Sequence, residues 1–314
     1  MMKNIKIKII MIIIVVFVSL GLIVTLDLIS KQKEYSGDIE IVHELGTTKV
    51  SKNPKKIVVF DYAILETLDA LEIDVIGIPK ANVPSHLSKY TAKEIYDVGT
   101  LFEPNFELLY SLEPDLIIIG GRQKSLYAQF QEVGPTIYIG FDNANFFDSF
   151  ENNLILLSKI FTNENRFENY LQEVKAEIEE VNKIASNSNL NAIVLMVSGS
   201  TVSALGIGSR YDVVYSDFGV KVADPNLEIS THGVEVTFEY IYELNPDIIF
   251  VIDRDLITEK SESAKKLLNN AFVNKTKAAK NNRIIYLSPN QWYLTTGGYY
   301  SIKVMINEVK SAYN

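Results

Sequence analysis

From about residue 57 onward, hydrophobic residues fall into short unbroken runs that alternate with amphipathic stretches. Ile57 to Phe60, Leu116 to Ile119 and Ile248 to Ile252 lack the polar alternation of a strand with one wet face, which is typical of strands buried in a parallel sheet. Helical patterns stand between such runs, as in Ala63 to Leu71. Strand, helix and strand in repetition predict an α/β fold whose parallel sheet is covered on both faces.

One helix–strand unit occurs twice. Residues 105–123 read NFELLYSLEPDLIIIGGRQ, and residues 237–255 read TFEYIYELNPDIIFVIDRD. In each copy an amphipathic helix stops before a proline, which cannot continue the helix and favours an extended residue before it. A buried strand follows, and Arg122 or Arg254 stands just past its carboxyl end, where open α/β sheets place their ligands. Two copies predict two similar lobes.

Between the copies lies a long amphipathic stretch, from Thr162 to about Ser186, whose apolar residues recur at steps of three and four. At about 1.5 Å per residue, this helix would reach some 35 Å. Its position indicates a strut between the lobes, although a surface helix of one lobe has the same pattern. The predicted organisation is a signal or anchor helix (1–29), a tether (30–40), an N-terminal α/β lobe (41–160), an interlobe helix (161–187) and a C-terminal α/β lobe (188–314).

The N-terminus carries a candidate membrane segment. Lys3, Lys6 and Lys8 precede an uncharged run from Ile9 to Leu26, which has about the minimum length that spans a bilayer. The positive flank stays inside, so the rest of the chain is exported. No small-residue cleavage site follows the run. We therefore favour an uncleaved anchor that holds the chain at the extracytoplasmic face of the membrane. A cleaved signal would instead leave it in a periplasm or secreted.

Composition narrows the function classes. The chain has 314 residues, of which 47% are hydrophobic, enough to bury the core of two domains. Its net charge of −9, without any basic stretch, argues against nucleic-acid binding. The sequence contains no cysteine, which excludes disulfides, thiolate metal sites and a lipid-modified cysteine. We expect a monomer that holds any anionic ligand by local positive charge.

Three arginines supply that charge. Arg122, Arg210 and Arg254 lie in the segments GGRQ, GIGSRY and VIDRD, each after a strand or in a glycine-bearing loop. The planar guanidinium fork suits phosphate, carboxylate and catecholate oxygens. A single such arginine is more often part of a surface salt bridge. Three at strand ends, two of them related by the repeat, favour a shared anion site.

The histidines and the last aromatic loop complete the candidates. His43 and His86 lie in polar segments and are expected to be solvated, whereas His232 precedes the second repeat in a loop that should open at the cleft. Their spacing does not fit a zinc site. Trp292, the only tryptophan, is expected in the core, so the adjacent Tyr293 should point elsewhere and could reach the cleft. No Gly-x-Ser-x-Gly elbow is present, and the site looks built to bind rather than to react.

These motifs carry a family resemblance. From about Ile41 to its end the chain resembles the siderophore-binding proteins of bacterial iron ABC importers, in particular the catecholate group that handles petrobactin-type and enterobactin-derived ligands. The resemblance rests on HELGTTKVSKNPKKIVVFD, the two repeated units, GSRYDVVYSDFGV and QWYLTTGG. It implies two Rossmann-like α/β lobes with mainly parallel sheets, joined by one long helix, and a ferric siderophore held between them. The iron complex is then a ligand, with no intrinsic cofactor.

The resemblance also implies roles for residues of the cleft. Arg122, Arg210 and Arg254 fall on the arginine triad that faces the anionic ferric catecholate. His232 and Tyr293 fall on the histidine and tyrosine that, in some members, complete the iron coordination when the siderophore supplies only four oxygens. With a hexadentate siderophore, neither residue need touch the metal.

Glu107 and Glu239 match the glutamates that, in this class, dock each lobe against arginines of the permease and, through it, its ATPase. A second explanation is their position in the first turn of a helix, where a carboxylate is favoured by the dipole. Both explanations can hold. Gram-positive relatives usually carry a lipid-anchored cysteine, which this chain lacks.

Two alternatives stay open. A haem- or corrinoid-binding protein of the same fold would need an apolar slot with one axial ligand in place of three cations. A metal chelatase or siderophore esterase could also use a two-lobed α/β frame, but the sequence offers no nucleophile or strong acid–base pair. We therefore expect a binding protein and not an enzyme.

Overall fold

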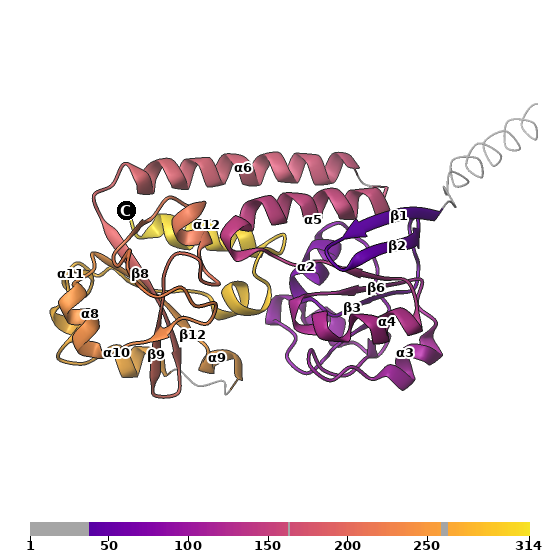
Figure 1. Cartoon of the computed structure of the whole chain (residues 1–314), viewed down its shortest axis with the longest axis horizontal. Coiled ribbons are helices and arrows are strands. Elements are labelled where there is room, and N and C mark those ends of the chain that lie inside the picture. Colours follow the sequence, from indigo (N-terminus) through magenta and orange to yellow (C-terminus); the bar gives the residue numbers. More distant parts are fainter. Residues whose placement is uncertain (1–37, 163, 259–262) are drawn as a thin grey trace, which may run out of the picture.

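The computed structural model describes residues 38–162, 164–258 and 263–314. The chain forms two α/β lobes placed side by side along its longest axis, with α6 running over both (Figure 1). The α/β class with mainly parallel sheets is confirmed. The expected membrane segment, Ile9 to Leu26, lies outside the described residues. Within the described ranges, no helix is both long enough and apolar enough to cross a membrane.

The N-terminal lobe is built on a five-stranded parallel sheet with the order β5-β4-β3-β6-β7. An antiparallel hairpin of β1 and β2 precedes it. Its strands are β1 (Asp38–His43), β2 (Gly46–Ser51), β3 (Ile57–Val59), β4 (Gly77–Ile78), β5 (Tyr96–Asp97), β6 (Leu116–Ile119) and β7 (Thr136–Tyr138). Its helices are α2 (Tyr62–Ala70), η1 (Ser85–Thr91), α3 (Phe106–Leu112), η2 (Gly121–Leu126), α4 (Tyr127–Val133) and η3 (Asn143–Asn145).

The C-terminal lobe has a six-stranded mixed sheet. Strands β10, β8, β12 and β13 pair in parallel. Strand β9 pairs antiparallel with β8, because the chain returns through a tight turn at Gly199, whose φ is +59°, and β11 pairs antiparallel with β9. Its strands are β8 (Asn191–Ser198), β9 (Thr201–Leu205), β10 (Lys221–Val222), β11 (Val234–Glu235), β12 (Ile248–Asp253) and β13 (Ile284–Tyr286). Its helices are α7 (Val213–Ser216), α8 (Phe238–Leu244), α9 (Asp255–Thr258), α10 (Ala264–Leu268), η4 (Val273–Lys275), α11 (Lys277–Lys280), η5 (Asn290–Leu294) and α12 (Ser301–Ser311).

The repeated sequence forms α3–β6 in one lobe and α8–β12 in the other, and both strands are completely buried. The sequence predicts an extended residue before each proline. In the structure this residue is left-handed instead. Glu113 has φ 47° and Asn245 has φ 48°. A left-handed residue closes the end of a helix by turning the chain sharply, and here this need outweighs the preference imposed by the proline.

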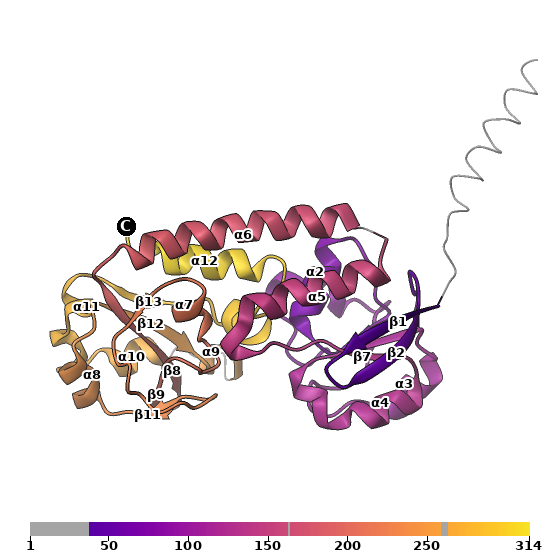
Figure 2. The ribbon, with the colours of Figure 1, turned by 45° about the horizontal axis from the view of Figure 1, so that its top comes forward.

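Helix α6 (Glu164–Ser186) connects the lobes within the range expected for the interlobe helix. Its buried stripe includes Phe167, Tyr170, Val174 and Val181. A second helix that the sequence pattern does not single out, α5 (Phe146–Ile160), lies along α6, as does α12 (Figure 2). One continuous hydrophobic core contains side chains of both lobes and of these three helices. The lobes therefore pack together through α5, α6 and α12 and are not connected by a single helix alone.

Candidate functional site

A cavity of about 450 Å³ opens between the lobes. The N-terminal lobe contributes residues that follow β3, β6 and β7, and the C-terminal lobe contributes the loops after β9 and before β11 together with η5. The polar residues that line it include Asp61, Arg122, Arg210, His232 and Tyr293. An apolar wall is formed by Phe102, Phe141, Phe146 and Leu294. The cavity thus joins charged groups of both lobes to an aromatic wall.

Two arginines from different lobes converge on one backbone oxygen. Arg122 Nη2 donates to the carbonyl of Tyr293 at 3.0 Å, and Arg210 Nη2 donates to the same carbonyl at 2.7 Å. Arg122 belongs to η2 of the N-terminal lobe, while Arg210 and Tyr293 belong to the C-terminal lobe. The carbonyl therefore holds two positive charges side by side, which prepares them for an anionic ligand.

The ring of Tyr293 collects all three sequence-predicted arginines. The guanidinium carbon of Arg210 lies 4.3 Å from the ring centroid, that of Arg254 5.8 Å and that of Arg122 5.9 Å. Such distances are within the range of cation–π attraction. Arg254 is not among the residues that line the cavity, and its Nη1 lies 3.5 Å from the hydroxyl of Ser198. The structure thus brings the triad together around one aromatic side chain.

Tyr293 follows a buried tryptophan. Trp292 is fully buried, and its indole Nε1 donates to Glu308 at 2.7 Å. Trp292 fills the core from the π-helical turn η5, and the adjacent Tyr293 is half-buried, packing against the edge of that core while it lines the cavity. Both expectations for this pair, core for the tryptophan and cleft for the tyrosine, agree with the structure.

Arg210 and His232 lie on two adjoining loops. The backbone N–H of Arg210 donates to the carbonyl of Thr231 at 3.2 Å, which fixes the two loops together. Gly208 has φ +77°, and a side chain there would collide with Ile229 of the second loop. His232 is exposed at the cavity. Gly208 therefore permits the close approach of the two loops.

Asp61 is a cavity residue that the sequence analysis missed. It caps α2 by accepting from the amides of Ala63 and Ile64 at 2.9 and 3.1 Å. Burial raises the pKa of its carboxyl, and the nearby charge of Arg122 acts against that rise. Its position between a buried strand and a helix was a signal for a helix cap, but nothing in the spacing tied it to the arginines.

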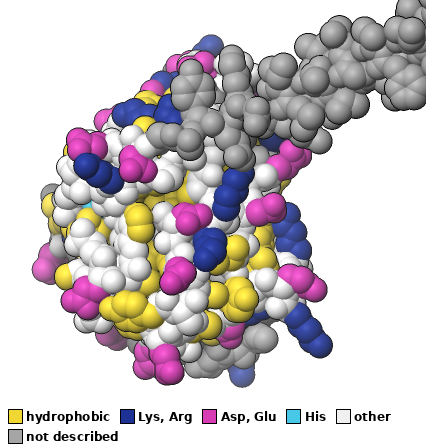
Figure 3. Space-filling model, turned by 90° about the vertical axis from the view of Figure 1, so that its right-hand side faces the viewer, with side chains coloured by type: hydrophobic (Ala, Val, Ile, Leu, Met, Phe, Trp, Pro, Cys, Tyr) yellow, Lys and Arg dark blue, Asp and Glu magenta, His cyan; other side chains and the backbone are white. Residues whose placement is uncertain are grey.

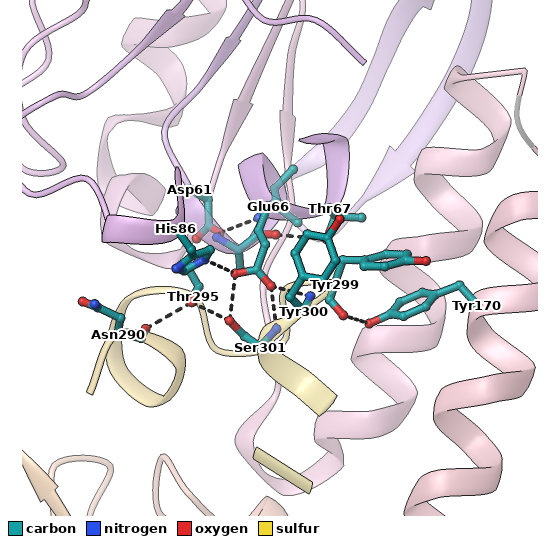
Figure 4. Close-up of polar contacts among 12 residues, drawn as sticks. Asp61, Glu66, Thr67, His86, Tyr170, Asn290, Thr295, Tyr299, Tyr300 and Ser301 are labelled. Carbon is teal, nitrogen blue, oxygen red and sulfur yellow. Dashed lines mark hydrogen bonds and ion pairs between the residues drawn. The ribbon is translucent and has the colours of Figure 1, made fainter. Parts of the chain in front are cut away.

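Two histidines were expected to be solvated. The structure corrects this for His43, which is partly buried, whereas His86 is exposed but also pairs with a buried carboxylate. His43 Nε2 lies 3.1 Å from the Thr48 hydroxyl and 3.3 Å from that of Tyr127, and burial lowers the pKa of the imidazole. His86 Nε2 lies 2.7 Å from Oε2 of Glu66, a fully buried carboxylate (Figure 4). The Thr48 contact lies within the β1–β2 hairpin, whereas the contacts of His43 with Tyr127 and of His86 with Glu66 join separate segments, which local sequence patterns do not predict.

Glu107 and Glu239 occupy equivalent places outside the cavity. Glu107 is in the first turn of α3, and Glu239 is in the first turn of α8. Both side chains are exposed. Each helix also has a separate side-chain cap, Asn105 for α3 and Thr237 for α8. The helix ends are capped without these two glutamates, which leaves their carboxylates available to a partner.

The electrostatics of the cavity run against the net charge of the chain. The chain carries −9 overall, and basic and acidic side chains are interspersed on the end of the N-terminal lobe (Figure 3). Inside the cavity Arg122 and Arg210 stand beside Asp61, where burial raises the pKa of the carboxyl and the two arginine charges oppose that rise. Among residues 38–162, 164–258 and 263–314, no group of three or more metal-ligating side chains is found. The arrangement is suited to an anionic ligand with flat, partly apolar parts.

Known proteins resemble this chain closely. The model of the periplasmic binding protein family matches residues 57–291. The petrobactin-binding protein YclQ of Bacillus subtilis is 43% identical over 276 residues, which cover 87% of each chain. Its crystal structure gives a TM-score of 0.86 and covers 88% of this chain and 99% of that one.

Two relatives from Vibrio are more distant. The ferric-anguibactin-binding protein FatB of Vibrio anguillarum is 31% identical over 88% of this chain and 87% of its own length. The periplasmic catecholate-siderophore binding protein VctP of Vibrio cholerae is 31% identical, with a TM-score of 0.84 over 88% of this chain and all of that one. The family match over most of the described lobes and the relative of 43% identity lead to one conclusion: the chain belongs to the periplasmic binding protein family.

Proposed function

We propose that this protein captures a ferric catecholate siderophore in the interlobe cavity and delivers it to the permease of an ABC importer. The observation that carries the proposal is the convergence of Arg122 and Arg210, one from each lobe, on a single oxygen in the cavity. A ligand that bears several negative oxygens can engage both lobes at once. The relatives YclQ, FatB and VctP, which bind petrobactin, ferric anguibactin and catecholate siderophores, support the same class of ligand.

The electrostatic attraction between the arginines and the proposed ligand is large enough to support binding. A ferric tris-catecholate is a trianion, and one pair of unit charges about 6 Å apart contributes roughly 3 kcal/mol at an effective dielectric near 20, before desolvation. Arg122, Arg210 and Arg254 together would outweigh the repulsion from the acidic chain. Catechol rings also offer faces to guanidinium groups and to the aromatic wall of the cavity. We assign the three arginines to ligand binding.

His232 and Tyr293 are proposed as conditional ligands of the iron that the siderophore carries. Both line the cavity. An imidazole nitrogen and a tyrosinate oxygen are suitable donors for iron(III) that a tetradentate siderophore leaves with two open positions. A hexadentate siderophore fills those positions itself. The metal is cargo in either case and not part of the protein.

Glu107 and Glu239 are proposed as the permease-docking residues. They sit on equivalent helices of the two lobes, exposed and outside the cavity. A partner with one basic site for each lobe could read both carboxylates. We place the working protein on the extracytoplasmic side of the membrane, as a monomer that binds without turning over its ligand. Anchoring through the N-terminal segment belongs to the same proposal.

Titration with a small panel of iron complexes tests the proposal, with Trp292 as the fluorescent reporter because it precedes Tyr293 in the cavity turn. The panel contains ferric petrobactin, ferric enterobactin, its linear bis-catechol fragment, a ferric hydroxamate and haem. We expect saturable quenching by a catecholate complex and weaker or no binding of the hydroxamate. Preferred binding of haem would support the haem-protein alternative. Turnover of a bound siderophore would support an enzyme.

A further inference from the structure

A buried glutamate joins the two lobes a short way from the arginines. Glu66 belongs to α2 of the N-terminal lobe and is 0% exposed. Its Oε1 accepts from the backbone amides of Tyr300 and Ser301 at 2.5 and 2.6 Å, and its Oε2 accepts from the Ser301 hydroxyl at 2.8 Å (Figure 4). His86 Nε2 lies 2.7 Å from Oε2 on the other side. A carboxylate of one lobe is thus enclosed by donors of both.

The donors from the C-terminal lobe are the first residues of α12. The first amides of a helix have no partner within it, and the positive end of the helix dipole favours a carboxylate there. Glu66 satisfies these amides from another lobe, 235 positions away in sequence. Gly298 makes the approach possible, because a Cβ at this residue would lie 2.8 Å from the Glu66 carboxyl group. The second glycine of QWYLTTGG therefore makes room for the glutamate.

Two hydroxyls continue the connection to the binding cavity. The hydroxyl of Ser301, which donates to Glu66, lies 2.7 Å from the hydroxyl of Thr295. The Thr295 hydroxyl in turn donates to the carbonyl of Asn290 at 3.1 Å. Thr295 directly follows η5, and its amide donates to the carbonyl of Asn290 at the other end of that turn. The turn contains Tyr293, whose carbonyl holds Arg122 and Arg210. Polar contacts thus link Glu66 to Asn290, the first residue of the turn that carries the Tyr293 carbonyl.

We propose that Glu66 is a positioning residue of the binding site: by fixing the start of α12 to α2, it holds the Tyr293 turn where arginines of both lobes meet. The expected effect on affinity rests on the proposed siderophore function, whereas the effect on the turn does not. Glu66 itself lies outside the cavity lining.

Hydrogen exchange of the ligand-free full chain tests the positioning. We expect Glu66→Ala to speed the exchange of amides in residues 292–296 by about tenfold, since hydrogen bonds to a buried carboxylate are lost. Glu66→Gln keeps an acceptor oxygen and should stay within about threefold of the wild type. Leu268→Ala is the control, because Leu268 is buried in a separate core of the C-terminal lobe. This variant should lower the melting temperature without affecting residues 292–296.

Two results would overturn the proposal. One is faster exchange in Glu66→Ala that is confined to Tyr300 and Ser301, which would make Glu66 a helix cap and nothing more. The other is exchange at residues 292–296 that rises equally in Leu268→Ala, which would make the effect one of general stability.

The affinity for ferric petrobactin is a second test of the role of Glu66. Glu66→Ala should bind about tenfold more weakly than the wild type, with Glu66→Gln and Leu268→Ala close to the wild type. An unchanged affinity in Glu66→Ala would contradict the positioning role. A wild type that binds no ferric siderophore would instead refute the proposed function, and the exchange result would still decide the role of Glu66.

Discussion

The two copies of the repeated unit share their backbone but not their chemistry. Each copy places a left-handed residue, a buried strand and an arginine in the same order. Arg122 of the first copy reaches across to a carbonyl of the other lobe, whereas Arg254 of the second copy contacts Ser198 of its own lobe. Arg210, His232 and Tyr293 have no counterpart in the first copy. The two copies share a frame, and the proposed site draws more of its residues from the loops of the C-terminal lobe.

The helix starts of the two copies offer the largest expected effect. Exchange of both Glu107 and Glu239 for glutamine should abolish siderophore-dependent uptake in cells while purified protein binds its ligand normally, because both carboxylates lie outside the cavity. Each single variant should retain part of the uptake if both copies dock alike. Weakened binding in the double variant would place the glutamates in the ligand site instead.

The strand ends of the two copies should differ in strength. Arg122→Ala and Arg210→Ala should each lose about 2–3 kcal/mol of binding free energy, since both are charge-assisted donors at the cavity. Arg254→Ala, which lies outside the cavity lining, should lose about 1.5 kcal/mol. Fluorescence titration measures all three. Arg283→Ala removes the same charge outside the cavity and should bind like the wild type; an equal loss there would reduce the effect to net charge.

The roles of His232 and Tyr293 can be tested by comparing siderophores that offer the iron four or six donor atoms. If His232 and Tyr293 complete the iron coordination, His232→Ala and Tyr293→Phe should weaken a tetradentate bis-catechol complex by about tenfold and a hexadentate complex hardly at all. Tyr293→Phe keeps the backbone carbonyl that holds the arginines, so it isolates the phenol. Equal losses for both ligands would show that these residues act on the site without ligating the metal.

The smallest expected effect concerns Asp61 and the pH dependence of stability. Burial raises the pKa of this carboxyl, so the folded chain holds the proton more tightly than the unfolded chain does. The resulting stabilisation is complete below the ordinary pKa of an aspartate and is lost as the pH rises through the raised value. Asp61→Asn keeps an acceptor for the amides of Ala63 and Ile64 but cannot ionise.

Relative to Asp61→Asn, the wild type should therefore lose melting temperature as the pH rises above the ordinary aspartate pKa of about 4. Thermal unfolding followed by Trp292 fluorescence measures the difference. A difference that stays constant as the pH rises, or that changes in the opposite direction, would contradict the raised pKa.

The sequence predicts those parts of the molecule that local patterns determine. Unbroken apolar runs located β3, β6 and β12, and arginines just past strand ends marked the cleft, because the topology of parallel sheets brings those ends together. The left-handed residues before Pro114 and Pro246 were missed, since a rule for one residue gave way to the closing of a helix.

Contacts between distant segments could not be predicted. Glu66 stands in the amphipathic segment YAILETLDAL, where a glutamate reads as a solvated position, yet its partners lie at the start of α12. Asp61 and His86 were missed for the same reason. The neighbours of each side chain depend on which segments the tertiary packing brings close to it. The sequence pattern identified the arginines. The tertiary structure was needed to show that the Tyr293 carbonyl accepts hydrogen bonds from Arg122 and Arg210.

The central claim is that arginines of both lobes bind one ferric catecholate between them. A crystal structure of the protein with ferric petrobactin tests it most directly. We predict the iron complex in the cavity, with catecholate oxygens within hydrogen-bonding distance of Arg122 from one lobe and Arg210 from the other. A complex bound elsewhere, or in contact with the arginines of only one lobe, would contradict the claim.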